Sequence, residues 1–219
     1  MLRVLSCGAA VSYPSSMGQR TPPAELPHAA SKGSFVRVRE IVELGVDVDG
    51  VDDEGCTALQ LAVAEGFRDI AFYLVEHGAS IQHRDHLGFT PLHWAVYSSD
   101  PVLLAVVLSP ELGIDPVDID RRTPLSWAVA GEYNGSVRWL LLKGASANIG
   151  DKDGWTPLHF AAGNGDMDIV SLLLDAGANR CARSDVGETA ADVARRLYPD
   201  NEVLVMLLSE ANAPLRGRE

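Results

Sequence analysis

Apolar residues recur along this chain in blocks of fixed spacing, and each block starts at a threonine. The threonines are Thr57, Thr90, Thr123, Thr156 and Thr189, and each lies 33 residues after the one before. A leucine follows two residues after each of the first four, and an alanine follows five residues after all of them. A second apolar run comes later in the period, for example at residues 140–142 and 172–174. This pattern predicts two short, closely packed helices in each period.

The residues between the apolar blocks predict how each helix starts and ends. The threonine is suited to cap a helix, and a proline directly after it (Pro91, Pro124, Pro157) fits the first helical position, where no amide hydrogen is needed. A glycine such as Gly78 or Gly144 then ends the second helix in the left-handed conformation. Before each next threonine we expect a hairpin-like turn whose aspartate accepts hydrogen bonds from the turn's own amides; these are Asp52, Asp85, Asp118 and Asp151.

These blocks resemble the ankyrin repeat, whose signature T-P-L-H-x-A is met in full by Thr90-Pro91-Leu92-His93-Trp94-Ala95. A Gly-Ala pair 21 residues after the threonine is a second marker, as at Gly78-Ala79. The resemblance implies an all-α solenoid of stacked helix-turn-helix units with hairpin tips. We expect a repeat domain at residues 24–213 with six repeats, starting near 24, 57, 90, 123, 156 and 189. Its first and last repeats are degenerate caps, and flexible tails at 1–23 and 214–219 flank it.

The third and fourth repeats depart from the pattern. In the third, Ser99 replaces the glycine between the helices and Pro110 should stop the second helix early, which predicts a distorted loop at 109–116. The departure is either drift at a tolerant surface or a locally reshaped binding surface. In the fourth repeat, the glycine between the helices is expected at Gly131 or Gly135, shifted from the family position.

The net charge of −12 disfavours nucleic acid and acidic lipid as partners and favours a basic protein segment, unless it serves only solubility. Cys7, Cys56 and Cys181 are too far apart for a zinc site or a disulfide framework, so reduced intracellular thiols are expected. No run approaches the about 18 apolar residues that span a membrane. We expect a protein of the cytoplasm, the nucleus or both, although residues 1–24 also fit a transit peptide because they contain arginine and no acid.

No motif for phosphate binding, nucleophilic catalysis or zinc hydrolysis is present. His83 and His86 lie on a turn without a third metal ligand, and His93 and His159 occupy the family's structural histidine position. We therefore expect no enzyme, no cofactor and no metal. An uncharacterised enzyme or metal binder stays as the alternative from a different class.

The resemblance implies that partners dock on the concave face, which is made by the hairpin tips and the exposed side of the first helices. Phe89 and Trp155 are expected to point toward solvent as anchors, or else to pack sideways on their own hairpins. Trp94, Trp127 and Phe160 are expected to fill space between core and face. The predicted partner-binding residues, with an acidic end and an apolar strip across repeats 3 to 5, are Asp53, Glu54, His86, Leu87, Phe89, Tyr97, Ile119, Asp120, Arg122, Lys152, Asp153 and Trp155.

The sequence therefore favours a non-enzymatic, monomeric protein-interaction module, an adaptor, scaffold or inhibitor. Its partner would be a protein with a basic segment and an apolar anchor. A chaperone or adaptor of the proteasome or ubiquitin pathway is the alternative within that class, and a purely structural spacer is a third hypothesis.

Overall fold

The computed structural model describes residues 22–209. Within this range the chain forms twelve α-helices and no strand beyond an isolated bridge between Val51 and Thr57. The predicted tails at 1–23 and 214–219 lie outside the described residues, except that Pro22 and Pro23 already belong to the first helix. The all-α repeat solenoid expected from the sequence is confirmed.

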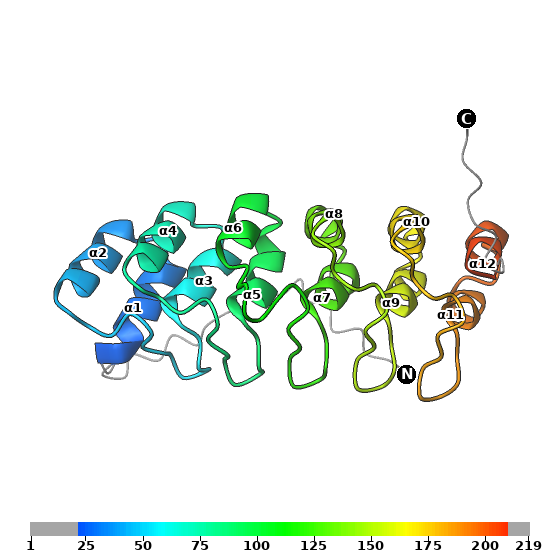
Figure 1. Ribbon diagram of the computed structural model, residues 1–219, viewed down its shortest axis with the longest axis horizontal. Coiled ribbons are helices and arrows are strands. Elements are labelled where there is room, and N and C mark those ends of the chain that lie inside the picture. The colour runs from blue at the N-terminus through cyan, green and yellow to red at the C-terminus, as the bar shows by residue number, and fades with distance from the viewer. Residues whose placement is uncertain (1–21, 210–219) are drawn as a thin grey trace.

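The helices form two parallel layers, and the hairpin tips project from one side of the stack (Figure 1). The first helices are α1 (Pro22–Ser31), α3 (Ala58–Ala64), α5 (Pro91–Ser98), α7 (Pro124–Ala130), α9 (Pro157–Asn164) and α11 (Ala190–Leu197). The second helices are α2 (Phe35–Glu43), α4 (Arg68–Glu76), α6 (Pro101–Val106), α8 (Asn134–Leu142), α10 (Met167–Asp175) and α12 (Glu202–Ser209). The first helices lie next to the tips, so both can contribute to one surface.

The threonines cap the first helices as expected. The Thr57 side-chain oxygen accepts a hydrogen bond from the backbone amide of Gln60 at 3.3 Å. In return, the backbone amide of Thr57 donates to the side-chain oxygen Oε1 of Gln60 at 2.8 Å. The same reciprocal arrangement occurs at Thr90, Thr156 and Thr189. Each cap satisfies amides at the helix start that have no partner inside the helix.

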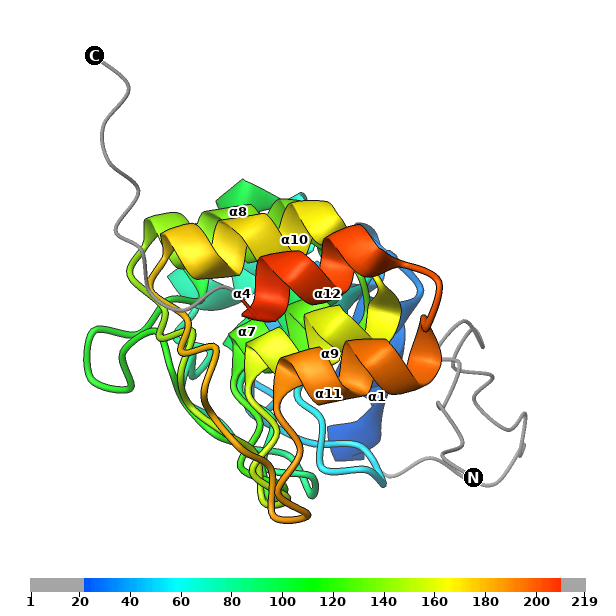
Figure 2. The ribbon, with the colours of Figure 1, turned by 90° about the vertical axis from the view of Figure 1, so that its right-hand side faces the viewer.

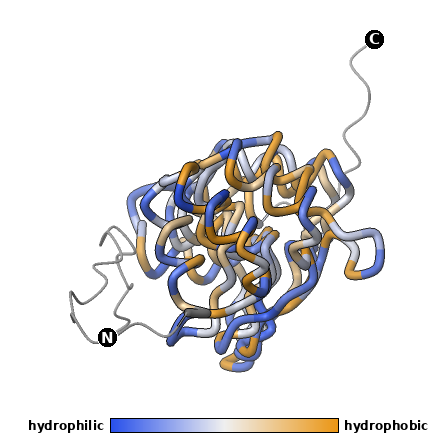
Figure 3. The backbone as a smooth tube through the Cα atoms, turned by 90° about the vertical axis from the view of Figure 1, so that its left-hand side faces the viewer, coloured by the Kyte–Doolittle hydropathy of each residue, from blue (hydrophilic) through white to orange (hydrophobic). Residues whose placement is uncertain are grey.

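The hydrophobic core runs through the whole stack between the layers. Its centre is formed by leucines of the first helices, all at most 2% exposed, namely Leu59, Leu92, Leu125 and Leu158. The alanines three residues after them are fully buried, which agrees with the need for a small side chain at this helix contact. In the end-on view of Figure 3 the helical layers carry most of the apolar positions, and the tips are mainly hydrophilic. Stability therefore comes from contact between neighbouring repeats.

In the first five repeats the turn between the two helices contains a left-handed residue, at an interval of 33. Gly33, Gly66 and Gly165 supply it in three repeats, whereas Ser99 (φ 52°) and Glu132 (φ 58°) supply it in repeats 3 and 4. The prediction of a shifted glycine in repeat 4 is wrong, because Gly131 has φ −93° and Gly135 lies inside α8. The turn of repeat 4 therefore keeps the spacing of 33 residues. Glu132 takes the left-handed conformation there, although this conformation is unfavourable for residues with a side chain.

Repeat 3 is distorted as predicted. Its second helix, α6, has six residues, whereas α4, α8 and α10 have nine each. Residues 109–116 are not helical, and the loop that contains them projects sideways from the stack in the end-on view of Figure 2. The helix ends at Val106, before Pro110 is reached.

Replacing Gly165 with alanine should destabilise the stack more than replacing Gly177. Both glycines are left-handed, at φ 75° and 85°, so each alanine costs about 1 kcal/mol in backbone strain. A Cβ on Gly165 would also lie 2.9 Å from the Tyr198 ring, whereas one on Gly177 meets nothing within 4 Å. We expect urea unfolding to show at least about 1 kcal/mol of additional loss for Gly165→Ala. Equal losses would show that the Tyr198 ring moves away without cost.

Candidate functional site on the inner face

Four of the five hairpin tips are held by an aspartate, which is buried in the three central ones. The Oδ1 atom of Asp85 accepts hydrogen bonds from the amides of Leu87 and Phe89, both at 2.9 Å. Asp52, Asp118 and Asp151 accept bonds from the amides two and four residues later in the same way. The predicted role of these aspartates is confirmed. In the last tip Ser184 takes this position, and its buried hydroxyl has no hydrogen-bond partner.

Neighbouring tips are joined by backbone hydrogen bonds. The amide of Ile119 donates to the carbonyl oxygen of Leu87 at 3.1 Å, and that of Lys152 donates to Asp120 at 2.8 Å. Equivalent bonds link the other tips, from His86 to Glu54 and from Asp185 to Asp153. The Lys152 ammonium also lies 2.6 Å from an Asp120 carboxylate oxygen. The tips therefore form one connected edge, which fixes the positions of the side chains that they carry.

The histidines of the repeat motif link each first helix to the following tip. His93 Nε2 lies 3.2 Å from the carbonyl oxygen of Arg122, and His159 Nε2 lies 3.1 Å from that of Glu188. Gln60 makes the same link, donating to Phe89 at 2.8 Å. Burial lowers the pKa of His93 to about 4 and also lowers the pKa of His159. Both are therefore neutral structural groups at pH 7, as the sequence indicates.

Phe89 does not point toward solvent, and this expectation is wrong. The ring is 5% exposed, and its centre lies 5.7 Å from that of Trp94 and 5.2 Å from that of Trp127 in the next repeat. The two indoles enclose the ring because each is oriented by a tip carboxylate: Trp94 Nε1 donates to Asp85 and Trp127 Nε1 donates to Asp118, both at 2.8 Å. Phe89 is thus a core residue beneath the inner face, which is the surface formed by the tips and first helices.

An arginine lies between two aromatic rings of this face. The guanidinium carbon of Arg122 is 5.1 Å from the Trp127 ring centre and 5.4 Å from that of Phe160. Its Nε atom donates to Asp151 at 3.3 Å, and the side chain is 26% exposed. Trp155 packs on Phe160 with ring centres 5.3 Å apart and stays partly exposed.

These residues form an aromatic row, composed of Trp94, Trp127, Arg122, Phe160 and Trp155. From the sequence we expected three of its members only to fill space. These three rings are partly exposed, so they also form part of the surface of the inner face, and their recurrence four residues after three of the threonines was the sequence signal for this. Tyr97 adjoins the row, with its ring centre 5.8 Å from that of Trp94.

The other predicted site residues lie on the tips. Leu87 and Ile119 are 53% and 65% exposed and are neighbours through their backbone hydrogen bond. Those with exposed polar side chains are Asp53, Glu54, His86, Lys152 and Asp153, and Asp120 is partly exposed. The predicted apolar strip is therefore divided into the aromatic row and a Leu87–Ile119 pair on the tips.

The acidic end of the stack is smaller than its composition indicates. Arg37 pairs with Glu25 at 2.6 Å and Glu40 at 3.0 Å, and Arg39 lies 3.6 Å from Glu43. Asp53 and Glu54 are exposed on the first tip and form no ion pair within residues 22–209. On the first tip, these two carboxylates are exposed and lack a cationic partner in the described range.

Catalytic and metal-binding chemistry receive no support in the described part of the chain. His83 Nε2 lies 2.9 Å from the Gly55 carbonyl oxygen, and residues 22–209 contain no group of three side chains suited to hold a metal ion. Burial raises the pKa of the Cys56 thiol, which keeps it protonated. None of the helices in this range has the length and apolar character to cross a membrane.

Comparison with known proteins agrees with the geometry. A family model for ankyrin repeats (3 copies) matches residues 21–85 and 125–216. Human palmitoyltransferase ZDHHC17 is 32% identical over 77% of this chain and 32% of its own length. The Lachancea kluyveri palmitoyltransferase AKR1 is 35% identical over 72% of this chain and 22% of its own. This chain therefore spans about a third or less of the length of these relatives.

Solved structures with similar folds are also ankyrin proteins. The ankyrin repeat domain of Bcl-3 aligns with a TM-score of 0.72 and 32% identity, covering 84% of this chain and 86% of that one. The ankyrin repeat protein EF0377 aligns with a TM-score of 0.74 and 28% identity, covering 86% and 98%.

Replacing His93 with glutamine should flatten the dependence of stability on pH. The pKa of His93 is about 4 in the folded state and about 6.5 when unfolded, so its neutral form stabilises the fold above pH 6.5. This stabilisation, about 3 kcal/mol in total, is lost as pH falls from 6.5 to 4. Glutamine preserves the link, as Gln60 shows, without titrating. Urea unfolding at pH 7.5 and pH 5 should show a smaller difference for the variant than for the wild type. If the difference in unfolding free energy between pH 7.5 and pH 5 were the same for both proteins, His93 would not be the titrating group. The variant Gln60→His should show a larger difference than the wild type.

Proposed function

This chain belongs to the ankyrin-repeat family, whose repeats generally bind other proteins and are not enzymes, and we propose that it binds a partner protein on its inner face. The aromatic row is the observation that carries the proposal. The indole N–H groups of Trp94 and Trp127 are already bonded to tip carboxylates, so these two residues present ring faces to a partner, next to the Arg122 guanidinium. The connected tips hold this surface in place before a partner arrives, which lowers the entropic cost of binding.

The partner that fits this surface has an apolar or aromatic anchor and a basic residue. The anchor would contact Trp155 and its neighbours, and the basic residue would pair with Asp53 and Glu54. In this role the chain would act as a monomeric adaptor, scaffold or inhibitor. Which of the three applies depends on what else the partner binds.

The palmitoyltransferase relatives favour a second candidate function. They match this chain only through their ankyrin regions, at 32% and 22% of their lengths. The chain would then select proteins for an acyltransferase, and the described residues would contribute recognition and no chemistry. A ubiquitin-pathway role has weaker support, from 28% identity to the E3 ubiquitin-protein ligase KEG of Arabidopsis thaliana over 14% of its length.

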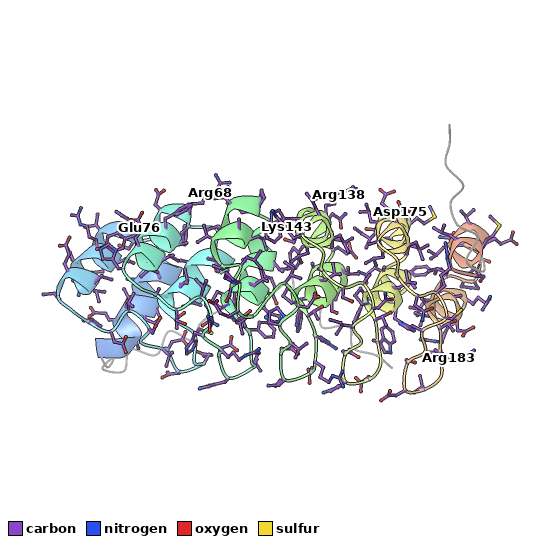
Figure 4. The ribbon with its side chains drawn as sticks, viewed as in Figure 1. Arg68, Glu76, Arg138, Lys143, Asp175 and Arg183 are labelled. Carbon is purple, nitrogen blue, oxygen red and sulfur yellow. The ribbon has the colours of Figure 1, made fainter. Side chains whose placement is uncertain are left out.

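A displayed library of random peptides, selected on the wild-type chain, tests the proposal and provides a ligand. For the selected peptides, Trp155→Ala should weaken binding by at least about fivefold, the effect of losing about 1 kcal/mol at a hot spot. Arg138→Ala is the matched control, because Arg138 lies on α8 on the side away from the tips (Figure 4). Unchanged binding by a folded Trp155→Ala variant, or equal weakening by Arg138→Ala, would contradict binding on the inner face.

Phe89 should affect folding rather than binding. Removing its enclosed ring leaves a cavity between Trp94 and Trp127, so Phe89→Ala should lower the free energy of unfolding by about 3 kcal/mol. Phe89→Leu refills much of this space and should bind the selected peptides like the wild type. Urea unfolding measures the first effect and peptide titration the second. If Phe89→Ala were as stable as the wild type, Phe89 would be a surface residue and not part of the core.

A further inference from the structure

The second helix and loop of repeat 3 differ from their counterparts in every other central repeat. We propose that residues 99–121, here called the weak unit, open locally while the repeats on both sides stay folded. The proposal does not depend on a partner, because it concerns the free chain. Four observations on this segment support it.

Strained backbone conformations bracket the weak unit. Ser99 at its start has φ 52° and Arg121 at its end has φ 61°. Repeats 2 and 5 have left-handed glycines at both corresponding positions (Gly66 and Gly88, Gly165 and Gly187), whereas repeat 4 has Glu132 and Gly154 and is strained at the first position only. A residue with a side chain is disfavoured in this conformation, so opening the weak unit releases strain at both ends.

The helix inside the weak unit is short, and the residues after it are not helical. α6 has six residues and rests on the core through Leu103 and Leu104, followed by Val107 just after its end. Residues 109–116 then continue without helical structure. Short helices with few buried side chains belong to the parts of a protein that open at low cost.

One link between repeats 2 and 3 runs to an exposed side chain of repeat 3 and not to a backbone amide. Behind the tips, Asp49 accepts a bond from the Ser80 amide, Asp115 from Ser146, and Asn148 from Asn179. The corresponding link would join Gln82 to the Gly113 amide, but that amide donates to Ser109 within the loop, at 2.9 Å. Gln82 instead donates to the exposed Glu111 carboxylate.

The neighbouring helices do not need the weak unit to stay together. The buried Ser136 hydroxyl of α8 donates to the Val96 carbonyl oxygen of α5 at 2.8 Å, which joins repeat 4 to α5 directly. On the other side, Gln60 holds the Phe89 carbonyl oxygen just before α5. The first-helix layer is therefore continuous when α6 is absent from the second layer.

Opening of the weak unit also reaches the aromatic row. Asp118 lies inside the unit and accepts the indole N–H of Trp127. When the unit opens, this indole loses its orienting carboxylate. A partner that binds Trp127 in the oriented state therefore opposes opening, a consequence that rests on the proposed function.

Hydrogen exchange of the whole chain in low urea, followed by mass spectrometry, tests the proposal. Wild-type amides in 99–121 should exchange faster and with a smaller urea dependence than those of α4 and α10, because local opening exposes little surface. The double variant Ser99→Gly/Arg121→Gly should slow exchange in 99–121 by about tenfold, while α4 and α10 change little.

The reciprocal variant Gly66→Ser/Gly187→Arg is the matched control. A Cβ at Gly66 would meet only Ser98, at 4.0 Å, and a Cβ at Gly187 would meet nothing within 4 Å, so both changes add backbone strain without a clash at the Cβ. It should speed exchange next to residues 66 and 187 and leave 99–121 unchanged. If 99–121 exchanges together with α4 and α10 in the wild type, or if the glycine variant slows all three equally, the stack opens as one unit and the proposal is wrong.

Discussion

The aspartate carboxylates of the three central tips each join their own tip to a side chain outside it. In Asp85, Oδ1 accepts two amides of its own tip, while Oδ2 accepts the indole N–H of Trp94 and lies 3.6 Å from the Cys56 sulfur of the preceding repeat. Asp118 and Asp151 use Oδ1 in the same way, and their Oδ2 atoms accept Trp127 and Arg122. All three residues are at most 7% exposed. A buried carboxylate is tolerated only when it is hydrogen-bonded this fully, so tip shape and ring orientation are set together.

Because tip shape depends on the aspartate, the last tip of the inner face, which lacks it, differs from the others. At the last tip Ser184 is too short to replace aspartate, and its hydroxyl has no partner. At this tip Arg196 forms a two-bond pair with Glu188, and Arg183 donates to the Gly187 carbonyl oxygen as Arg84 does to Gly88.

The sequence predicted the fold and most of the tip chemistry because both depend on residues within one period. The threonine caps, the aspartate turns and the structural histidines each need partners that the 33-residue spacing supplies. The exposure of Phe89 and Trp155 was harder to predict, since both lie one residue before a threonine. What separates them is the next repeat, where Trp127 covers Phe89 but the smaller Val193 stands in the position after Trp155. Periodicity places a side chain, but the neighbouring repeat decides whether it is covered.

The centre of the inner face is also where the repeats are joined differently. Ser126 replaces the histidine that elsewhere reaches the next tip; its hydroxyl interacts with Thr123, 3.1 Å away, and forms no bond to the next tip. Arg122 connects repeats 3, 4 and 5 at this point through Asp151, Trp127 and Phe160. Unlike the buried imidazoles, it is partly exposed. A ligand that contacted Arg122 would therefore touch a group that also holds the stack together, and its binding would be coupled to the stability of the central repeats through one side chain.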